Sequence, residues 1–175
     1  NGDDLLITAN GISFLMKYVA PGSFYMGSSQ EGSYANERPV HKVYLDEGYY
    51  IGETEVTQEL WKAVMGNNPA QFQSPLYPVV QVSYIDCKHF IDSLSRVTGF
   101  DFRLPSEAEW EFAARGGVKS RKTQYSGSDT LDSIAWCGMN SKRHVHDVKS
   151  KFPNELGIYD MTGNVEEWCN DKYGE

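Results

Sequence analysis

Residues 104–117, LPSEAEWEFAARGG, carry both the start and the stop signals of a short helix. Ser106 and Glu109 have the spacing of a capping box, in which each side chain binds the backbone N–H of the other residue. Gly116 and Gly117 then supply the left-handed backbone that ends a helix. The chain also holds 16 glycines, seven prolines and 13% aromatic residues. These features favour a loop-rich fold packed by aromatic side chains over a helical bundle.

Two further helices are predicted upstream. The first begins near Thr57 and ends at Gly66 and Pro69, because glycine and proline terminate helices. The second begins at Ser83, has acidic Asp86 three residues later, and ends at Gly99. Apolar residues recur at helical spacing in both: Leu60, Trp61, Val64 and Met65 in the first, and Cys87, Phe90, Ile91, Leu94 and Val97 in the second.

Strand-forming residues dominate the first third of the chain. Residues 11–19, 22–28 and 41–57 are rich in β-branched and aromatic residues, which predicts strands. Residues 29–39 are polar and are expected to form a surface loop. Residues 134–175 are expected to form short strands and long structured loops. Helices placed between antiparallel strands predict an α+β fold, and 175 residues suffice for one domain with its own core.

Charge and hydropathy exclude two classes of interaction. Sixteen basic residues against 24 acidic ones give a net charge of −8, so the basic surface that nucleic acids require is absent. No run of 18 apolar residues occurs in the sequence, and therefore no membrane-spanning segment is expected. The chain begins with Asn1 rather than methionine, which is compatible with a leader that has been removed.

The three cysteines, Cys87, Cys137 and Cys169, include no CxxC pair. The usual spacing of a structural zinc site is therefore missing. At most one internal disulfide can form among three cysteines, which would leave one free thiol. The favoured interpretation is that all three are small buried hydrophobic residues.

An acidic turn stands near the end of the chain, in the stretch YDMTGNVEEW at residues 159–168. Calcium takes about six to eight oxygen ligands, drawn from carboxylates and backbone carbonyls. Asp160 and Glu167 could supply side chains to such a site, while Gly163 and Val165 supply carbonyls. A hairpin turn with acidic surface residues explains the same pattern, and spacing alone favours it because the stretch is no EF-hand.

Other motifs give weaker evidence for a functional site. His144 and His146 would share one face of a strand and so form half of a transition-metal site. No clear third ligand stands near them, so surface histidines are the favoured interpretation. The signatures of a serine nucleophile elbow, a phosphate-binding loop and a zinc protease are missing from the sequence. Residue chemistry alone thus leads to an acidic, turn-rich α+β domain with a candidate calcium site.

Four segments, taken in order and spacing, resemble one family. They are GSFYMGS (22–28), ERPVHKVYLDEGYYIGETEVTQELWKAVMGNNP (37–69), PVVQVSYIDCKHFIDSLSRVTGFDFRLPSEAEWEFAARGG (78–117) and PNELGIYDMTGNVEEWCNDKYG (153–174). They look like the sulfatase-modifying-factor, or formylglycine-generating-enzyme, domain. The motifs RLPSEAEWEFAARGG and LGIYDMTGNVEEW are highly specific to it. The resemblance implies an α+β variant of the C-type-lectin-like fold, with little regular secondary structure and with bound calcium.

The resemblance also assigns the acidic turn to a calcium site. By position, Asp160 and Glu167 would bind calcium through their side chains, and Gly163 and Val165 through backbone carbonyls. Glu166 stands where the family has an aromatic residue, which adds a charge without removing a ligand. A second family site begins at the position of Asn140, but its other ligands lie in a longer loop that this chain lacks. One filled calcium site is therefore expected.

The resemblance leaves catalysis undecided. The active enzymes bind copper through two cysteines on a final strand and use oxygen to convert a sulfatase cysteine to formylglycine. This chain stops at Glu175, before that strand, and its three cysteines do not match the catalytic pair. We therefore expect a single domain, residues 1–175, that lacks its carboxy-terminal strands and holds no catalytic residue. Copper is expected only if a missing carboxy-terminal region carries the cysteine pair.

Two functions from different classes follow. The favoured one is a non-catalytic binding or structural module, as in family members that resemble lectin-like scaffolds, exported lipoproteins or variable ligand-binding proteins. The alternative is the amino-terminal portion of a copper-dependent oxidase acting on sulfatases. A third, ergothioneine-type sulfoxide synthesis, needs an iron site from a helical domain that this sequence does not contain. We also expect export (periplasmic, cell-surface or lipoprotein), a protein or peptide ligand, and a partner that covers an exposed sheet edge.

Overall fold

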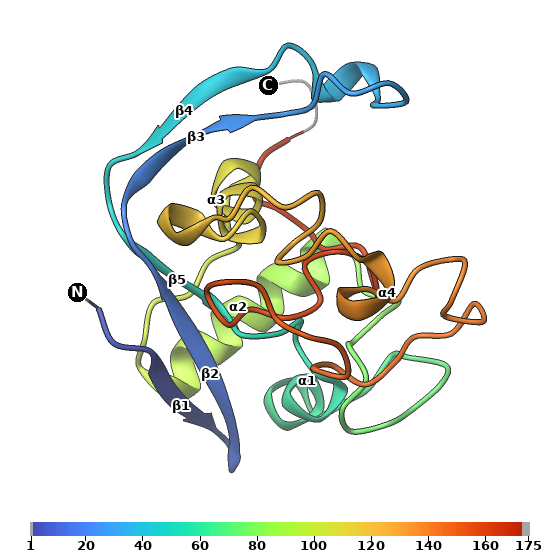
Figure 1. The fold of residues 1–175 in the computed structure, drawn as a ribbon. Coiled ribbons are helices and arrows are strands. Elements are labelled where there is room, and N and C mark those ends of the chain that lie inside the picture. The colour runs from blue at the N-terminus through green and yellow to red at the C-terminus, as the bar shows by residue number, and fades with distance from the viewer. Residues whose placement is uncertain (1, 173–175) are drawn as a thin grey trace.

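Within residues 2–172, which the computed structural model describes, five strands form two antiparallel sheets (Figure 1). In the first sheet, β2 (Ile12–Val19) lies between β1 (Leu5–Ala9) and β5 (Tyr49–Gly52). The second sheet is the pair β3 (Gly22–Met26) and β4 (His41–Leu45). These strands confirm the predicted strand-rich first third of the chain.

The hairpin of β1 and β2 turns at Asn10 and Gly11, whose φ angles are 47° and 88°. Asn-Gly is the pair that best tolerates positive φ at both positions, and the resulting turn matches the twist of the flanking strands. Leu5 lies opposite Met16, and Ala9 opposite Ile12. The sequence prediction omitted β1, although its Asn-Gly turn was a readable signal.

Helices and helical turns fill the spaces between and after the strands. Within the described residues they are η1 (Ala35–Glu37), α1 (Gln58–Met65), α2 (Tyr84–Thr98), α3 (Glu107–Ala114), η2 (Gly117–Lys119) and α4 (Leu131–Ile134). The fold is therefore a loop-rich mixture of short antiparallel strands and helices, as the sequence predicted.

The predicted helix caps are present. The hydroxyl of Thr57 accepts a hydrogen bond from the first turn of α1, and Gly66 ends that helix in the left-handed conformation. Ser83 forms a capping box at the start of α2, and Ser106 forms another at the start of α3. These local rules hold because a cap satisfies backbone N–H groups that the helix itself leaves unpaired.

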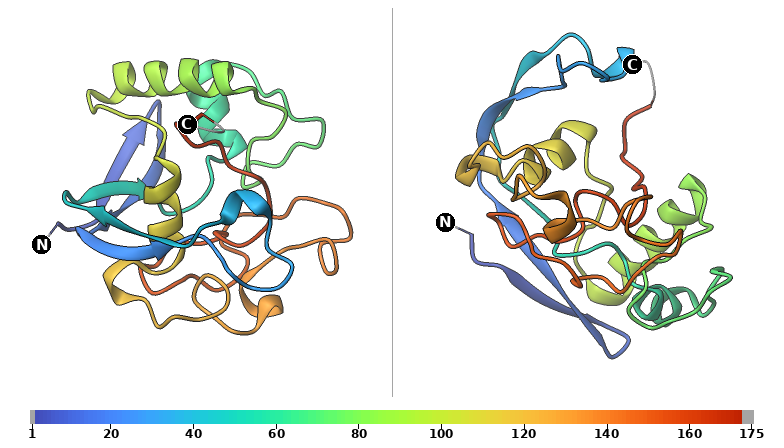
Figure 2. Two further views of the ribbon diagram at one scale, coloured as in Figure 1. Left: turned by 90° about the horizontal axis from the view of Figure 1, so that it is seen from above. Right: turned by 45° about the vertical axis from the view of Figure 1, so that its right-hand side comes forward.

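Two apolar clusters make the core. In one, Phe112 of α3 packs against Phe24 of β3, with 5.2 Å between ring centroids. In the other, Trp61 of α1 stacks on Phe90 of α2 at a centroid distance of 4.9 Å. Seen from above, α2 and the loops of residues 120–165 lie on opposite sides of the molecule (Figure 2).

Two details differ from the sequence prediction. Val97 is 44% exposed, because the last turn of α2 extends past the apolar cluster. Residues 135–172 contain no strand; buried side chains replace strand pairing there. Asn154, for example, donates from Nδ2 to the Ala113 carbonyl at 2.9 Å and accepts at Oδ1 from the Ile158 N–H at 3.2 Å.

Candidate metal centre and adjoining cavity

The acidic turn adopts a backbone that few residues tolerate. Asp160, Gly163 and Asn164 have φ angles of 60°, 106° and 59°, all in the left-handed region that favours glycine. The Asn164 N–H donates to the Trp136 carbonyl at 2.7 Å. Because N–H and C=O point in opposite directions across a trans peptide, the Gly163 carbonyl is turned away from Trp136. The turn therefore leaves this carbonyl available to a ligand.

The surroundings of the Asp160 carboxylate give the clearest indication of a ligand site. The residue is 4% exposed, and its Oδ2 accepts a hydrogen bond from the Lys149 N–H at 2.9 Å. Its other oxygen, Oδ1, is buried and has no hydrogen-bond partner. Burial raises the pKa of the Asp160 carboxyl above its usual value, and the Lys149 N–H only partly opposes the rise. A buried carboxylate oxygen without a partner is costly unless a cation or proton satisfies it.

Glu167 lies seven positions further along, in the wall of a cavity. The residue as a whole is exposed to solvent, although its carboxyl lies in a desolvated environment. Desolvation raises the pKa of Glu167, and repulsion from Asp160 adds to the rise. The indole of Trp110 partly opposes it, but the Trp110 N–H lies outside hydrogen-bond geometry. The charge of Asp160 thus acts on the carboxyl of Glu167.

Glu55, which the sequence did not single out, joins the same site from the segment between β5 and α1. It is 7% exposed and accepts hydrogen bonds from Asn164 Nδ2 at 3.0 Å and from the Val165 N–H at 3.3 Å. Burial, followed by repulsion from Glu167 and Asp160, raises the pKa of Glu55 to about 9. No local motif could have revealed a residue that lies more than 100 positions from its partners.

The donor set fits a hard cation. Carboxylate and carbonyl oxygens are the ligands that calcium prefers, and this stretch contains the carboxylates of Asp160 and Glu167 and the backbone carbonyls of Gly163 and Val165. Within residues 2–172, no three Asp, Glu, His or Cys side chains converge as a metal site of their own. A cation here would therefore depend on backbone oxygens for part of its coordination.

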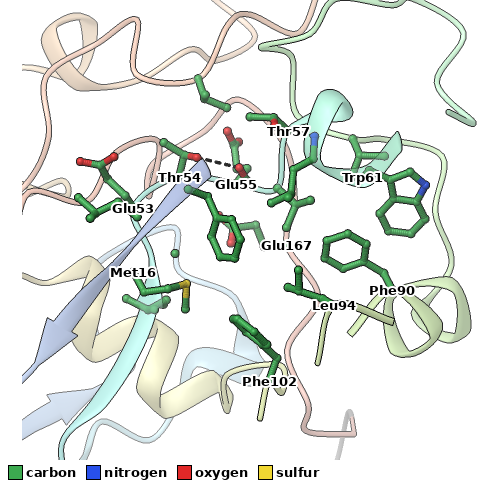
Figure 3. Close-up of a pocket in the computed structure, with 18 of the residues that line it drawn as sticks. Met16, Glu53, Thr54, Glu55, Thr57, Trp61, Phe90, Leu94, Phe102 and Glu167 are labelled. Carbon is green, nitrogen blue, oxygen red and sulfur yellow. Dashed lines mark hydrogen bonds between the residues drawn. The ribbon is translucent and has the colours of Figure 1, made fainter. Parts of the chain in front are cut away.

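A large apolar cavity adjoins these carboxyl groups. Its volume is about 860 Å³, and it lies between the sheet of β1, β2 and β5 and the helices α1 and α2. Phe90, Leu94 and Phe102 contribute to its apolar lining, and Glu55 and Glu167 lie close together in its wall (Figure 3). β5 also borders the cavity, and in the described sheet its far edge has no neighbouring strand. The cavity thus combines apolar walls, acidic groups and the edge strand of the described sheet.

The remaining residues singled out by sequence have structural roles. His146 stacks on Trp136 with 3.7 Å between ring centroids, while His144 contacts Phe72 edge-on. The two histidines therefore do not share one site. Asn140 accepts from the Cys137 N–H at 2.8 Å and donates to Asp132 Oδ1 at 2.8 Å, so its amide is already occupied within the protein.

The three cysteines form no disulfide with one another. All three are free thiols, and each is partly buried. Burial raises the pKa of Cys87, and burial together with Glu167 and two other carboxylates raises the pKa of Cys169 to about 12. The sequence predicted three buried cysteines, but each of them is only partly buried.

Comparison with known proteins decides the family. The model of the sulfatase-modifying factor enzyme 1-like domain matches residues 15–175. The chain belongs to this family. The sulfatase-modifying-factor domain is 34% identical over 171 residues to the chaperone protein LppX of Paenibacillus barcinonensis, covering 69% of this chain and 61% of LppX. It is also 34% identical over 123 residues to the formylglycine-generating enzyme of Thermomonospora curvata, covering 63% of this chain and 39% of that enzyme.

Solved structures show the same fold. The domain superposes on Treponema denticola variable protein 1 with a TM-score of 0.85 and 34% sequence identity, covering 97% of this chain and 77% of that one. The sulfatase-modifying-factor domain therefore spans less than two thirds of the two curated relatives named above, and about three quarters of this solved relative. In the described part of the domain, every helix is too short or too polar to cross a membrane.

Proposed function

We propose that this domain binds one calcium ion at the acidic turn and serves as a non-catalytic binding module. The observation that carries the calcium site is the buried Asp160 Oδ1, which has no hydrogen-bond partner. Asp160 and Glu167 would hold the ion through side chains, and Gly163 and Val165 through carbonyls. The bound ion would supply the positive charge that balances these oxygens, and the protein would supply a turn already shaped around them.

Calcium titration of chelator-treated protein by calorimetry tests this site. One binding event is expected for the wild type, and none for Glu167→Gln. Glu166→Gln is the matched control, because it removes the same charge from the neighbouring exposed position. Absence of binding to the wild type, or equal loss in the two variants, would contradict the proposed ligand set.

The state of the cysteines supports a non-catalytic role. Copper(I) chemistry in this family's oxidation requires a pair of thiolates, because soft sulfur ligands select the soft ion. Cys87 and Cys169 have raised pKa values and are therefore protonated at neutral pH. Cys87 lies on α2, whereas Cys169 lies in the segment that follows the acidic turn. The described residues thus offer no prepared thiolate pair.

The cavity supports a binding role. Its volume of about 860 Å³ falls within the usual range for ligand sites, about 300–1,000 Å³. β5, an edge strand of the described sheet, borders it, and edge strands can accept extended polypeptide as an added strand. We propose a protein or peptide ligand, whose apolar side chains alternate so that one face enters the cavity. LppX is named a chaperone protein, which agrees with such a role.

Selection from a displayed library of random peptides tests the ligand class. Peptides that alternate apolar and polar residues are expected to be enriched on the wild type. Leu94→Trp fills the cavity and should abolish that enrichment, whereas Met139→Trp adds the same side chain at a position that is 84% exposed. Enrichment without alternation, or on Leu94→Trp as strongly as on the wild type, would refute the proposed ligand.

A copper-dependent oxidase acting on sulfatases is the second candidate function. It is favoured by the 34% identity to a formylglycine-generating enzyme, of which the match covers 39%. The test incubates the protein with copper(I), oxygen and a cysteine-containing sulfatase peptide, and seeks an aldehyde by mass spectrometry. No product is expected from residues 1–175. Copper-dependent product that is lost on cysteine replacement would establish the oxidase.

We also propose that the protein is exported. The proposal rests on the similarity to LppX, 34% identical over 171 residues. Fractionation of the native cells with an antibody to this domain would place it. Recovery in the cytoplasmic fraction alone would refute export.

A further inference from the structure

Hydrogen bonds hold the backbone on either side of Glu55. It lies between the end of β5 and Thr57, the N-cap of α1. The Thr54 hydroxyl donates to the Glu55 carbonyl at 2.8 Å (dashed in Figure 3), and the Val79 N–H donates to the Val56 carbonyl at 2.9 Å. The backbone on both sides is therefore held by hydrogen bonds that do not involve the turn.

Both oxygens of the Glu55 carboxylate accept hydrogen bonds from the acidic turn. Oε2 accepts from Asn164 Nδ2 at 3.0 Å, and Oε1 accepts from the Val165 N–H at 3.3 Å. Asn164 is also held by His146, whose N–H donates to Asn164 Oδ1 at 3.0 Å. Asn164 has a φ of 59°, a region in which asparagine is enriched among non-glycine residues, and these bonds fix its side chain and the N–H of the residue that follows it.

Glu55 also adds a negative charge close to the two proposed ligand carboxylates. Its Oε1 accepts a hydrogen bond from the N–H of Val165, a proposed ligand residue, at 3.3 Å. Yet no three acidic, imidazole or thiol side chains of the described residues converge as a metal site. Glu55 therefore acts on an ion through the turn and through its charge rather than as a third side-chain ligand.

We infer that Glu55 is a positioning residue of the calcium site, which shapes the Asn164–Val165 backbone and strengthens the attraction of the site for cations. This inference rests on the proposed calcium site. It assigns a role to a residue outside the ligand set, and it predicts different effects on two measurable quantities. Replacing the carboxylate should weaken ion binding, whereas the ion-free protein should keep its stability.

The experiment compares Glu55→Gln with Glu53→Gln. Glu53 belongs to the same segment, but it pairs with Lys149 and its side chain points away from Glu55 (Figure 3). Calorimetry measures the affinities for calcium and for terbium(III), and thermal melting in chelator measures the stability of the ion-free form. Glu55→Gln should lose about 10–100-fold in calcium affinity, the usual cost of removing an outer-shell partner. It should lose more for terbium, because Coulomb attraction grows with ion charge.

Glu55→Asp separates geometry from charge. It keeps the carboxylate but shortens the side chain, so it should weaken both ions by the same factor and keep the wild-type ratio of their affinities. The ion-free Glu55→Gln protein should melt no lower than the wild type, which shows that it is folded. Glu53→Gln should retain wild-type affinity for both ions.

The outcomes are distinguishable. If the wild type binds no calcium, the proposed site itself fails. If the wild type binds calcium and Glu55→Gln binds as tightly, the site stands and the positioning role is overturned. If Glu55→Gln lowers the melting temperature in chelator and weakens calcium and terbium equally, Glu55 merely supports the fold, and the inference is again overturned.

Discussion

At the scale of single residues, Gly163 has a backbone that other residues cannot adopt at this position. Its φ is 106°, and a Cβ there would collide with the carbonyl oxygen of Trp136. Gly163→Ala should therefore lower the free energy of unfolding by about 1–3 kcal/mol. Denaturant unfolding in chelator measures the loss without a contribution from calcium. Gly138→Ala is the control, because a Cβ at Gly138 meets open space; an equal effect of the two changes would refute the steric argument.

At this scale, residue types alone predicted part of the candidate site. Asp160, Gly163, Val165 and Glu167 lie within eight consecutive positions, so their ligand chemistry could be predicted from one stretch, and that assignment stays a prediction. Glu55 could not be found this way. Its role arises because the chain returns to it 109 positions later, at Asn164, and no local pattern encodes that meeting.

At the scale of elements, α3 depends on Glu109 at its first turn. This carboxylate accepts from the Ser106 N–H at 2.8 Å and from two nitrogens of Arg103 at 2.6 Å each. Glu109→Gln should lower the free energy of unfolding at pH 7 by about 1–2 kcal/mol, because a charged cap and a bidentate ion pair are weakened together. Glu107→Gln removes the same charge from an exposed position of the same helix and should have little effect.

The same contact has a defined pH dependence. The hydrogen bond from Arg103 is the main interaction that lowers the pKa of Glu109 from its ordinary 4.5. A lowered folded-state pKa contributes stability that is present above the unfolded value and is lost as pH falls through the folded value. The stability gap between the wild type and Glu109→Gln should therefore shrink below pH 4.5. Urea unfolding from pH 3 to 7 follows it, and a gap that is independent of pH would disprove the charge contribution.

Element prediction from sequence worked where the signal was local. Ser83, Ser106 and Gly99 marked helix ends because caps act over three or four residues. It was wrong for residues 135–172, expected to contain strands, because buried side chains such as Asn154 organise that backbone through contacts more than 25 positions away. Contacts between residues far apart in the sequence also determine the strand register, the position of β5 at the edge of the described sheet, and the cavity.

At the scale of the whole molecule, the two apolar clusters meet around a cavity whose wall carries the acidic turn. Glu55, Asp160 and Glu167 all have raised pKa values in the absence of an ion. A carboxyl with a raised folded-state pKa contributes stability that is present at low pH and is lost as pH rises towards the folded value. The chelated protein should therefore lose stability between about pH 5 and pH 9.

Calcium should reverse this loss. An ion that binds only the folded state stabilises it by about 2.7 kcal/mol at a concentration one hundred times its Kd, and it binds best when the carboxylates are ionised. The calcium-induced rise in melting temperature should thus be larger at pH 8 than at pH 5. Magnesium at the same concentration serves as the control for ionic strength. An equal rise at both pH values would count against binding at these carboxylates.

The long span between Glu55 and Asn164 has a consequence for synthesis in the cell. The two residues are 109 positions apart, and chains grow at about 5–20 residues per second. Asn164 is therefore added to the chain roughly 5–20 s after Glu55. During that interval water hydrates the Glu55 carboxylate, so its bonds to Asn164 and Val165 can form only late in synthesis or after it.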